Sequence, residues 1–233
     1  MERYALRSGR YYQDDLISLL VQEVRRGETF VDIGANLGFV TLTAAKVVGP
    51  EGRVIAVEAN PVLTQRLRQT LERNDLRNVE VHNVALGDRA GEVTLVTQGH
   101  HGTSHIAPVR ADSDRIELKR GDDLLGDLAG PVFVKIDVEG AEQAVIDGLA
   151  TLLGKARVRW LVEICEEHLA RFDATPARLF ETMGRFGYSP YLSRLSPISG
   201  KVRLRPLPAP LRSQIYDVLF VRSEAAEPNA PGT

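Results

Sequence analysis

Hydrophobic residues along this chain form short runs that alternate with segments of helical periodicity. Apolar runs at residues 29–33, 53–57 and 79–84 have the length and composition of buried strands. Residues 39–48 and 61–74 follow the first two runs and place their apolar side chains on one face of a helix. The strand–helix–strand–helix–strand order predicts an α/β fold with a doubly wound, mostly parallel sheet and a ligand site at the carboxyl ends of its strands.

The middle of the chain does not follow this alternation of strands and helices. Alternating runs at residues 92–97 and 115–119 predict strands, and the polar, glycine-rich segment 98–105 between them predicts a mobile loop. We therefore expect a small hairpin-like insertion here, and we interpret residues 85–88, Ala-Leu-Gly-Asp, as a turn.

The regular pattern resumes at residue 131. The predicted elements are strands at 131–139, 158–165, 188–192 and 215–221, helices at 140–153 and 176–186, and a loop over the proline- and arginine-rich residues 193–212.

The two ends of the chain are predicted to lie outside the main domain. Residues 11–26 form an amphipathic pattern with an acidic first turn, which predicts a helix packed on the sheet edge. A second interpretation makes Tyr11 and Tyr12 part of a lid over the ligand. The chain is divided accordingly into an N-terminal helix at 1–28, one α/β domain at 29–222 and a disordered tail at 223–233.

The composition is that of an ordinary globular protein and limits the classes of function. The 233 residues are 43% hydrophobic and 26% charged, and the formal net charge of −2 lacks the basic excess typical of proteins that bind nucleic-acid backbones. No apolar run approaches the ~20 residues needed to cross a bilayer, and the first ten residues lack the apolar core of a signal peptide. Cys165 is the single cysteine, so an internal disulfide is excluded. We expect a cytoplasmic protein with no nucleic-acid or membrane partner; the sequence leaves the oligomeric state open, a homodimer included.

The turn Gly34-Ala-Asn-Leu-Gly38 after the first strand carries the clearest chemical signal. Glycines let a backbone approach a ligand, and Glu58, twenty residues further on, can accept hydrogen bonds from both hydroxyls of a ribose. Asp32 suits the cationic amino-acid end of S-adenosylmethionine better than a pyrophosphate, and the turn lacks the third glycine of the dinucleotide fingerprint. Methyl transfer is therefore favoured over two alternatives, a nicotinamide-dependent oxidoreductase and a noncatalytic S-adenosylmethionine-binding module.

Four segments together carry a family resemblance. They are Val-Asp-Ile-Gly-Ala-Asn-Leu-Gly-Phe-Val-Thr at 31–41, Val-Ile-Ala-Val-Glu-Ala-Asn-Pro at 54–61, the stretch from Asn78 to Asp88, and Val-Lys-Ile-Asp-Val-Glu-Gly-Ala-Glu at 134–142. With these segments the chain resembles the FkbM-type methyltransferases of the class I S-adenosylmethionine-dependent fold, over roughly residues 29–165. Ala59 departs from the family, which more often has proline after the glutamate.

The resemblance implies a seven-stranded sheet with an antiparallel last strand, and O-methylation of a hydroxyl on a small molecule such as a sugar, a polyketide or another natural product. It implies S-adenosylmethionine as cofactor. The methionine part of the cofactor would lie among Asp32, Gly34, Asn36, Gly38 and Thr41, and its ribose on Glu58. Its adenine would lie beside Ala85 and Leu86, and its sulfonium region opposite Asp137. The cofactor-binding residues implied are Asp32, Gly34, Asn36, Gly38, Thr41, Glu58, Ala59, Ala85, Leu86 and Asp137.

An acceptor hydroxyl is a poor nucleophile while it is protonated, so a general base within hydrogen-bond reach is expected. Strand alternation places Lys135, Asp137 and Glu139 on one side of their strand, and Asp137 and Glu139 are the catalytic candidates. The alternatives are a structural Lys135–Asp137 pair and a helix-capping role for Glu139. The candidate acceptor-binding residues are Ser104, His105, Glu163 and His168, of which the two histidines are also rival bases. We expect no metal ion.

Overall fold

The computed structural model describes residues 14–98, 103–109, 114–195, 202–207 and 215–222. Tyr11, Tyr12 and the tail at 223–233 lie outside this part of the chain, as do residues 99–102 of the predicted loop. No helix in the described ranges is long and apolar enough to cross a membrane.

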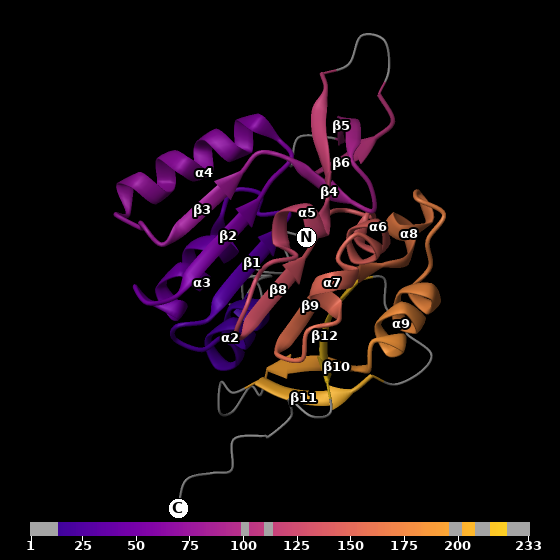
Figure 1. Ribbon diagram of the computed structural model, residues 1–233. Helices are drawn as coiled ribbons and strands as arrows, with labels where there is room; N and C mark the ends of the chain where they lie inside the picture. Colours follow the sequence, from indigo (N-terminus) through magenta and orange to yellow (C-terminus); the bar gives the residue numbers. More distant parts are fainter. Residues whose placement is uncertain (1–13, 99–102, 110–113, 196–201, 208–214, 223–233) are drawn as a thin grey trace, which may run out of the picture.

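A mostly parallel sheet forms the centre of the molecule (Figure 1). Its strands, in spatial order, are β11 (Val202–Pro206), β10 (Tyr188–Leu195), β12 (Ile215–Arg222), β9 (Val158–Cys165), β8 (Val132–Ile136), β1 (Thr29–Ile33), β2 (Arg53–Val57) and β3 (Val79–His82). The five strands from β9 to β3 run parallel, while β12, β10 and β11 each pair antiparallel with their neighbour. The α/β fold class predicted from the sequence is confirmed.

The predicted antiparallel last strand is confirmed in β12, but the prediction of seven strands is wrong, because eight strands form the main sheet in the described residues. The extra strand is β11, which falls within the residues expected to form a loop. In this strand Val202 and Leu204 alternate with arginines, and Val202 is buried. The side chain of Gln22 bonds both backbone groups of Val202, each at 3.0 Å. A side chain 180 residues away therefore anchors this edge strand, a contact that local sequence patterns do not reveal.

A second, smaller sheet confirms the hairpin-like insertion. Its order is β4 (Ala85–Gly87), β7 (Ile116–Arg120), β5 (Gly91–Gln98) and β6 (Thr103–Ala107). Strands β5 and β6 pair antiparallel and project away from the main sheet at the upper end of Figure 1. The interpretation of residues 85–88 as a turn is wrong, because 85–87 pair in parallel with β7.

Helices cover both faces of the main sheet. They are α2 (Asp14–Glu23), α3 (Phe39–Val48), α4 (Pro61–Arg73), α5 (Gly121–Leu125), α6 (Glu142–Asp147), α7 (Ala150–Leu153), α8 (Glu166–Ala170) and α9 (Pro176–Arg185). Strand alternation divides the core: Phe30 and Phe133 stack on the face covered by α2 and α3, whereas Val31 and Val134 belong to the cluster beneath α6, α7 and α9. Strands buried on both faces read as continuous apolar runs, which is why the sequence located them.

The helix predicted over 140–153 is two helices separated at Gly148. A Cβ at this position would lie 1.9 Å from the carbonyl oxygen of Gly87, so α6 approaches β4 more closely than a side chain allows. The absence of a side chain at Gly148 thus lets β4 of the second sheet pack against the end of α6.

We expect Gly148→Ala to destabilise the protein by about 1 to 3 kcal/mol, because the new methyl group overlaps backbone that cannot rotate away. The matched control is Gly184→Ala in α9, an exposed position with nothing within 4 Å of the added Cβ; there alanine should stabilise by up to about 1 kcal/mol. Urea unfolding of both variants measures the difference, and equal effects would contradict the proposed close approach.

Candidate active site

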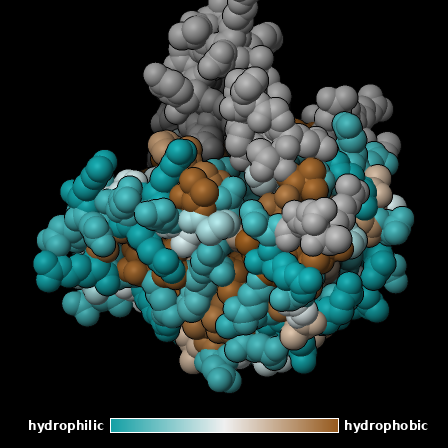
Figure 2. Space-filling view, turned by 90° about the horizontal axis from the view of Figure 1, so that it is seen from above, coloured by the Kyte–Doolittle hydropathy of each residue, from teal (hydrophilic) through white to brown (hydrophobic). Residues whose placement is uncertain are grey.

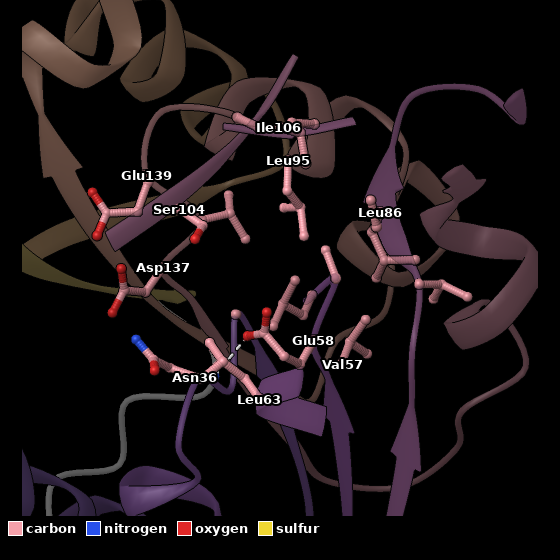
Figure 3. Close-up of a pocket in the computed structure, with 17 residues that line it drawn as sticks. Asn36, Val57, Glu58, Leu63, Leu86, Leu95, Ser104, Ile106, Asp137 and Glu139 are labelled. Atoms are coloured by element: carbon pink, nitrogen blue, oxygen red, sulfur yellow. Dashed lines mark hydrogen bonds between the residues drawn. The ribbon is translucent and has the colours of Figure 1, made fainter. Parts of the chain in front are cut away.

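A cavity lies at the carboxyl ends of β1, β2 and β8, beneath the hairpin of β5 and β6 (Figure 3). The empty space between the lining residues, part of it open to solvent, is about 730 Å³. The lining residues are Ile33, Gly34, Asn36, Val57, Glu58, Ala59, Leu63, Val84, Ala85, Leu86, Leu95, Ser104, Ile106, Asp137, Val138, Glu139 and Ala141. Figure 2 views this end of the molecule from above, and hydrophobic residues appear there in patches between hydrophilic ones.

The glycine turn after β1 forms one wall of the cavity. Gly34 has a φ of 84°, and a Cβ here would lie 1.8 Å from the carbonyl oxygen of Asp137. Only glycine permits this approach, which brings the turn after β1 against the turn after β8. The backbone N–H groups of Gly34 and Ala35 both bond the carbonyl of Val57, so the same turn is tied to β2.

Glu58 directly follows β2 and lies in the cavity wall, with 8% of its surface exposed. Its two oxygens accept backbone hydrogen bonds from Asn36, at 2.7 Å, and Asn60, at 2.8 Å. Each carboxylate oxygen can accept a second hydrogen bond, so both remain able to receive one from a ligand. Burial raises the pKa of Glu58, and the two N–H donors oppose the shift.

The cavity has an apolar side and a polar side. Figure 3 shows Leu86, Leu95 and Ile106 on one side, and the head groups of Asp137, Glu139 and Asn36 on the other. Ala85 and Leu86 were predicted from the sequence, whereas Leu95 and Ile106 were missed. These two residues are paired across β5 and β6 and share one face of the hairpin. The alternation of both strands is the signal that could have identified them.

On the polar side the carboxylate of Asp137 is held by a buried lysine. Lys135, 4% exposed, places its Nζ 2.9 Å from Oδ2 of Asp137 and 3.9 Å from Oδ1 of Asp32. Burial acts to lower the pKa of Lys135, but the carboxylates of Asp137 and Asp32 outweigh it and the net shift is upward. The Lys135–Asp137 pair given as the structural alternative is therefore present, and Asp137 lines the cavity as well.

Asp32, Gly38 and Thr41, which were expected around the cofactor, lie behind the cavity wall instead. Asp32 is 0% exposed and accepts a 2.6 Å hydrogen bond from the hydroxyl of Thr41. Strand alternation turns Asp32 towards the α3 face of the sheet, and burial raises its pKa although Lys135 opposes the shift. A Cβ at Gly38 would lie 2.2 Å from Leu67, so this glycine serves the packing of α3 on α4. These three residues are not among the residues that line the cavity, and their contact with the cofactor stays a prediction.

Comparison with known proteins agrees with this geometry. The sequence profile of the Methyltransferase FkbM domain family matches residues 32–190. The chain belongs to the FkbM methyltransferase family. The cofactor of this family is S-adenosylmethionine, as the sequence predicts.

Similar proteins of known name include a hexuronic acid methyltransferase, AglP, of Haloferax volcanii, 28% identical over 60% of this chain and 58% of its own length. An arsenite methyltransferase of Halobacterium salinarum is 43% identical, but over only 23% of this chain and 14% of its own length. The chain thus spans less than two thirds of these relatives.

Two solved structures share the fold. One is the methyltransferase FkbM of Methylobacillus flagellatus, with a TM-score of 0.57, 18% identity, and coverage of 88% of this chain and 47% of that one. The other is precorrin-6y C5,15-methyltransferase of Geobacter metallireducens, with a TM-score of 0.51, 17% identity, and coverage of 90% and 87%.

The residues present fit the FkbM cofactor. Glu58 offers acceptor oxygens at the middle of the cavity, an apolar recess lies on one side of it, and the carboxylate of Asp137 lies on the other. The acceptor oxygens of Glu58 match a diol, the apolar recess matches an aromatic base, and the carboxylate of Asp137 matches a cation. In the described parts of the chain, no group of three or more His, Cys, Asp or Glu side chains is arranged to hold a metal ion.

The four candidate acceptor residues are separated by the structure. Ser104 lines the cavity, whereas His105, the next residue of β6, does not. Glu163 and His168 also lie outside the lining, but Nδ1 of His168 is 3.1 Å from Oε2 of Glu139, which lines it. Glu163 pairs across the sheet with Asp217, and burial together with Asp137 and Asp217 raises its pKa to about 9.

Glu142, for which no role was predicted from the sequence, holds the turn beside the cavity. Its Oε1 accepts hydrogen bonds from the backbone N–H groups of Val138, at 3.2 Å, and Gly140, at 3.1 Å. It thereby fixes the turn that carries Asp137 and Glu139. Burial raises the pKa of Glu142 to about 7, against the effect of these donors.

We expect Lys135→Met to destabilise the protein by about 3 to 5 kcal/mol, because Asp32 and Asp137 then lose the cation between them. The control is Arg53→Met, which removes the Arg53–Glu80 ion pair; both side chains are about half exposed, so its loss should cost at most about 1 kcal/mol. Urea denaturation at neutral pH gives both values. A Lys135→Met variant as stable as Arg53→Met would show that the buried ion pairs contribute little.

Proposed function

We propose that this protein is an O-methyltransferase that transfers a methyl group from S-adenosylmethionine to a hydroxyl of a small molecule, a sugar, a polyketide or another natural product. The observation that carries the proposal is the division of the cavity, with Glu58 between an apolar recess and a pair of carboxylates at the opposite wall. The similarity to a protein named as a hexuronic acid methyltransferase supports a sugar hydroxyl as the acceptor.

The residues of the chain have separate tasks in this proposal. Glu58 holds the two ribose hydroxyls, Ala85 and Leu86 with Leu95 and Ile106 enclose the adenine, and Asp137 faces the positive end of the cofactor. The cofactor supplies a methyl group on a positively charged sulfur. The protein brings the acceptor oxygen into line with it, and alignment of this kind is worth ~7 to 11 kcal/mol of the barrier.

Glu139 is the general base of the proposed reaction. Its carboxylate lines the polar side of the cavity, and its ion-pair partner is His168, whereas Lys135 pairs with Asp137. Burial and the neighbouring Asp137 raise the pKa of Glu139, which brings a carboxylate closer to the range in which it accepts a proton well near neutral pH. Asp137 then remains the electrostatic partner of the cofactor.

The ribose contact predicts the effect of Glu58→Ala. Loss of a charged hydrogen-bond acceptor should weaken S-adenosylmethionine binding by about 1 to 3 kcal/mol, measured by calorimetry. Glu80→Ala on β3 serves as control, because Glu80 is not among the cavity residues. Unchanged affinity in Glu58→Ala would remove Glu58 from the cofactor site.

The proposed activity is tested by incubating the protein with S-adenosylmethionine labelled in its methyl group and with a panel of sugars, uronic acids and polyketide alcohols. Label should appear on an acceptor oxygen, and Glu139→Gln should lower turnover by about 10²- to 10⁴-fold while cofactor affinity changes less than about twofold. Label on nitrogen or carbon alone would contradict O-methylation. Equal losses of turnover and affinity would move Glu139 from catalysis to binding.

A further inference from the structure

Glu139 occupies a backbone conformation that favours glycine. Its φ is 58°, and that of Gly140 after it is 122°. A side chain in such a region is strained, and such residues persist where the surrounding structure enforces them. The strained turn places the carboxylate of Glu139 in the cavity wall. The question is which contact holds this carboxylate in one direction.

Helix α8 is packed directly against the strained turn. A Cβ at Gly140 would lie 2.4 Å from the carbonyl oxygen of His168 and 2.9 Å from the ring of Phe172. The contact follows from the topology: β8 and β9 are parallel neighbours, Glu139 comes after the carboxyl end of β8, and α8 begins at the end of β9. The order of the strands in the sheet therefore brings His168 and Glu139 into contact.

The side chains of the two residues pair at this junction. Nδ1 of His168 lies 3.1 Å from Oε2 of Glu139, and both side chains are partly buried, with 21% and 25% of their surface exposed. Glu139 lines the cavity and His168 does not, so the histidine acts from behind the carboxylate. Within the described residues no hydrogen bond reaches the second oxygen, Oε1.

We propose that His168 is a positioning residue for the methyl transfer: its Nδ1–H, donated to Oε2, aims Oε1 of Glu139 at the acceptor hydroxyl. This inference rests on the proposed function. In the step, the O–H bond of the acceptor breaks and its proton goes to Glu139. The acceptor oxygen forms the new O–CH₃ bond with its own electron pair, the bond from methyl to sulfur breaks with its pair staying on sulfur, and the proton then passes from Glu139 to solvent.

The charged groups around Glu139 and His168 predict how the pKa of Glu139 changes when the imidazole is removed. Burial and Asp137 raise the pKa of Glu139, while His168, Arg171 and Lys135 act to lower it. His168 in turn faces Glu139 from the β8 turn and His105 from β6, with Arg171 just beyond its own helix. Removal of the imidazole should therefore raise the pKa of Glu139 further and move the acidic limb of the kcat/KM profile to higher pH.

The experiment compares two substitutions of one residue. His168→Leu keeps much of the volume but removes the donor, whereas His168→Asn retains an amide N–H close to the place of Nδ1. We expect His168→Leu to lower kcat about 10- to 100-fold, with cofactor affinity within about twofold and the acidic limb displaced upward. His168→Asn should recover most of kcat. Carbon-13 NMR titration of the Glu139 carboxyl in the cofactor-free protein follows the same pKa change without catalysis.

The outcomes separate the inference from the function on which it rests. Equal kcat in His168→Leu and wild type, or no recovery by His168→Asn in a protein whose thermal unfolding is unchanged, would overturn the inference while methyl transfer stands. If the wild type methylates no acceptor, the proposed function fails. The NMR titration then decides the pairing alone, and an unchanged Glu139 titration in His168→Leu would refute it.

Discussion

The close approach of Gly34 to the carbonyl oxygen of Asp137 is the contact on which the site depends. Two parallel strands lie side by side, but their side chains alone would keep the turns after them apart. Because Gly34 has no Cβ and adopts a positive φ, the turn after β1 rests directly on the backbone after β8. The same turn donates two hydrogen bonds to Val57 and one, from Asn36, to Glu58. One glycine thus brings three strand ends to a single cavity.

Three charged side chains lie side by side at the wall of the cavity. Lys135 lies between Asp137, which reaches the cavity, and Asp32, which does not. Thr41 completes the row by donating to Asp32 from α3. A buried ammonium with two carboxylates leaves one negative charge in excess, and the member of the group exposed to a ligand is Asp137. The arrangement therefore favours a cation at that wall, where the family resemblance places the sulfonium opposite Asp137.

Features that depend on local sequence patterns were predicted correctly, whereas features that depend on contacts between distant segments were not. Strands β1, β2, β8 and β9 are buried on both faces, so their apolar runs were visible in the sequence, and Gly34 and Glu58, singled out from the sequence, both line the cavity. The depth of Asp32 depends on α3 covering its face of the sheet. The pairing of Glu139 with His168 depends on the order of strands, because 29 positions separate the two residues in sequence. Strand β11 is likewise held by Gln22, at the other end of the chain.

The turn between β8 and α6 shows how the stable parts of the fold maintain a strained functional one. Glu139 in a left-handed conformation is less favourable than glycine would be, and its partly buried carboxylate is held near Asp137, which opposes its ionisation. Glu142 bonds the backbone on both sides of Glu139, and α8 closes over Gly140 with almost no space between them. These contacts leave the turn few other conformations. A glycine at this position would relieve the strain, so a glutamate kept in this conformation supports the role proposed for its carboxylate in the cavity.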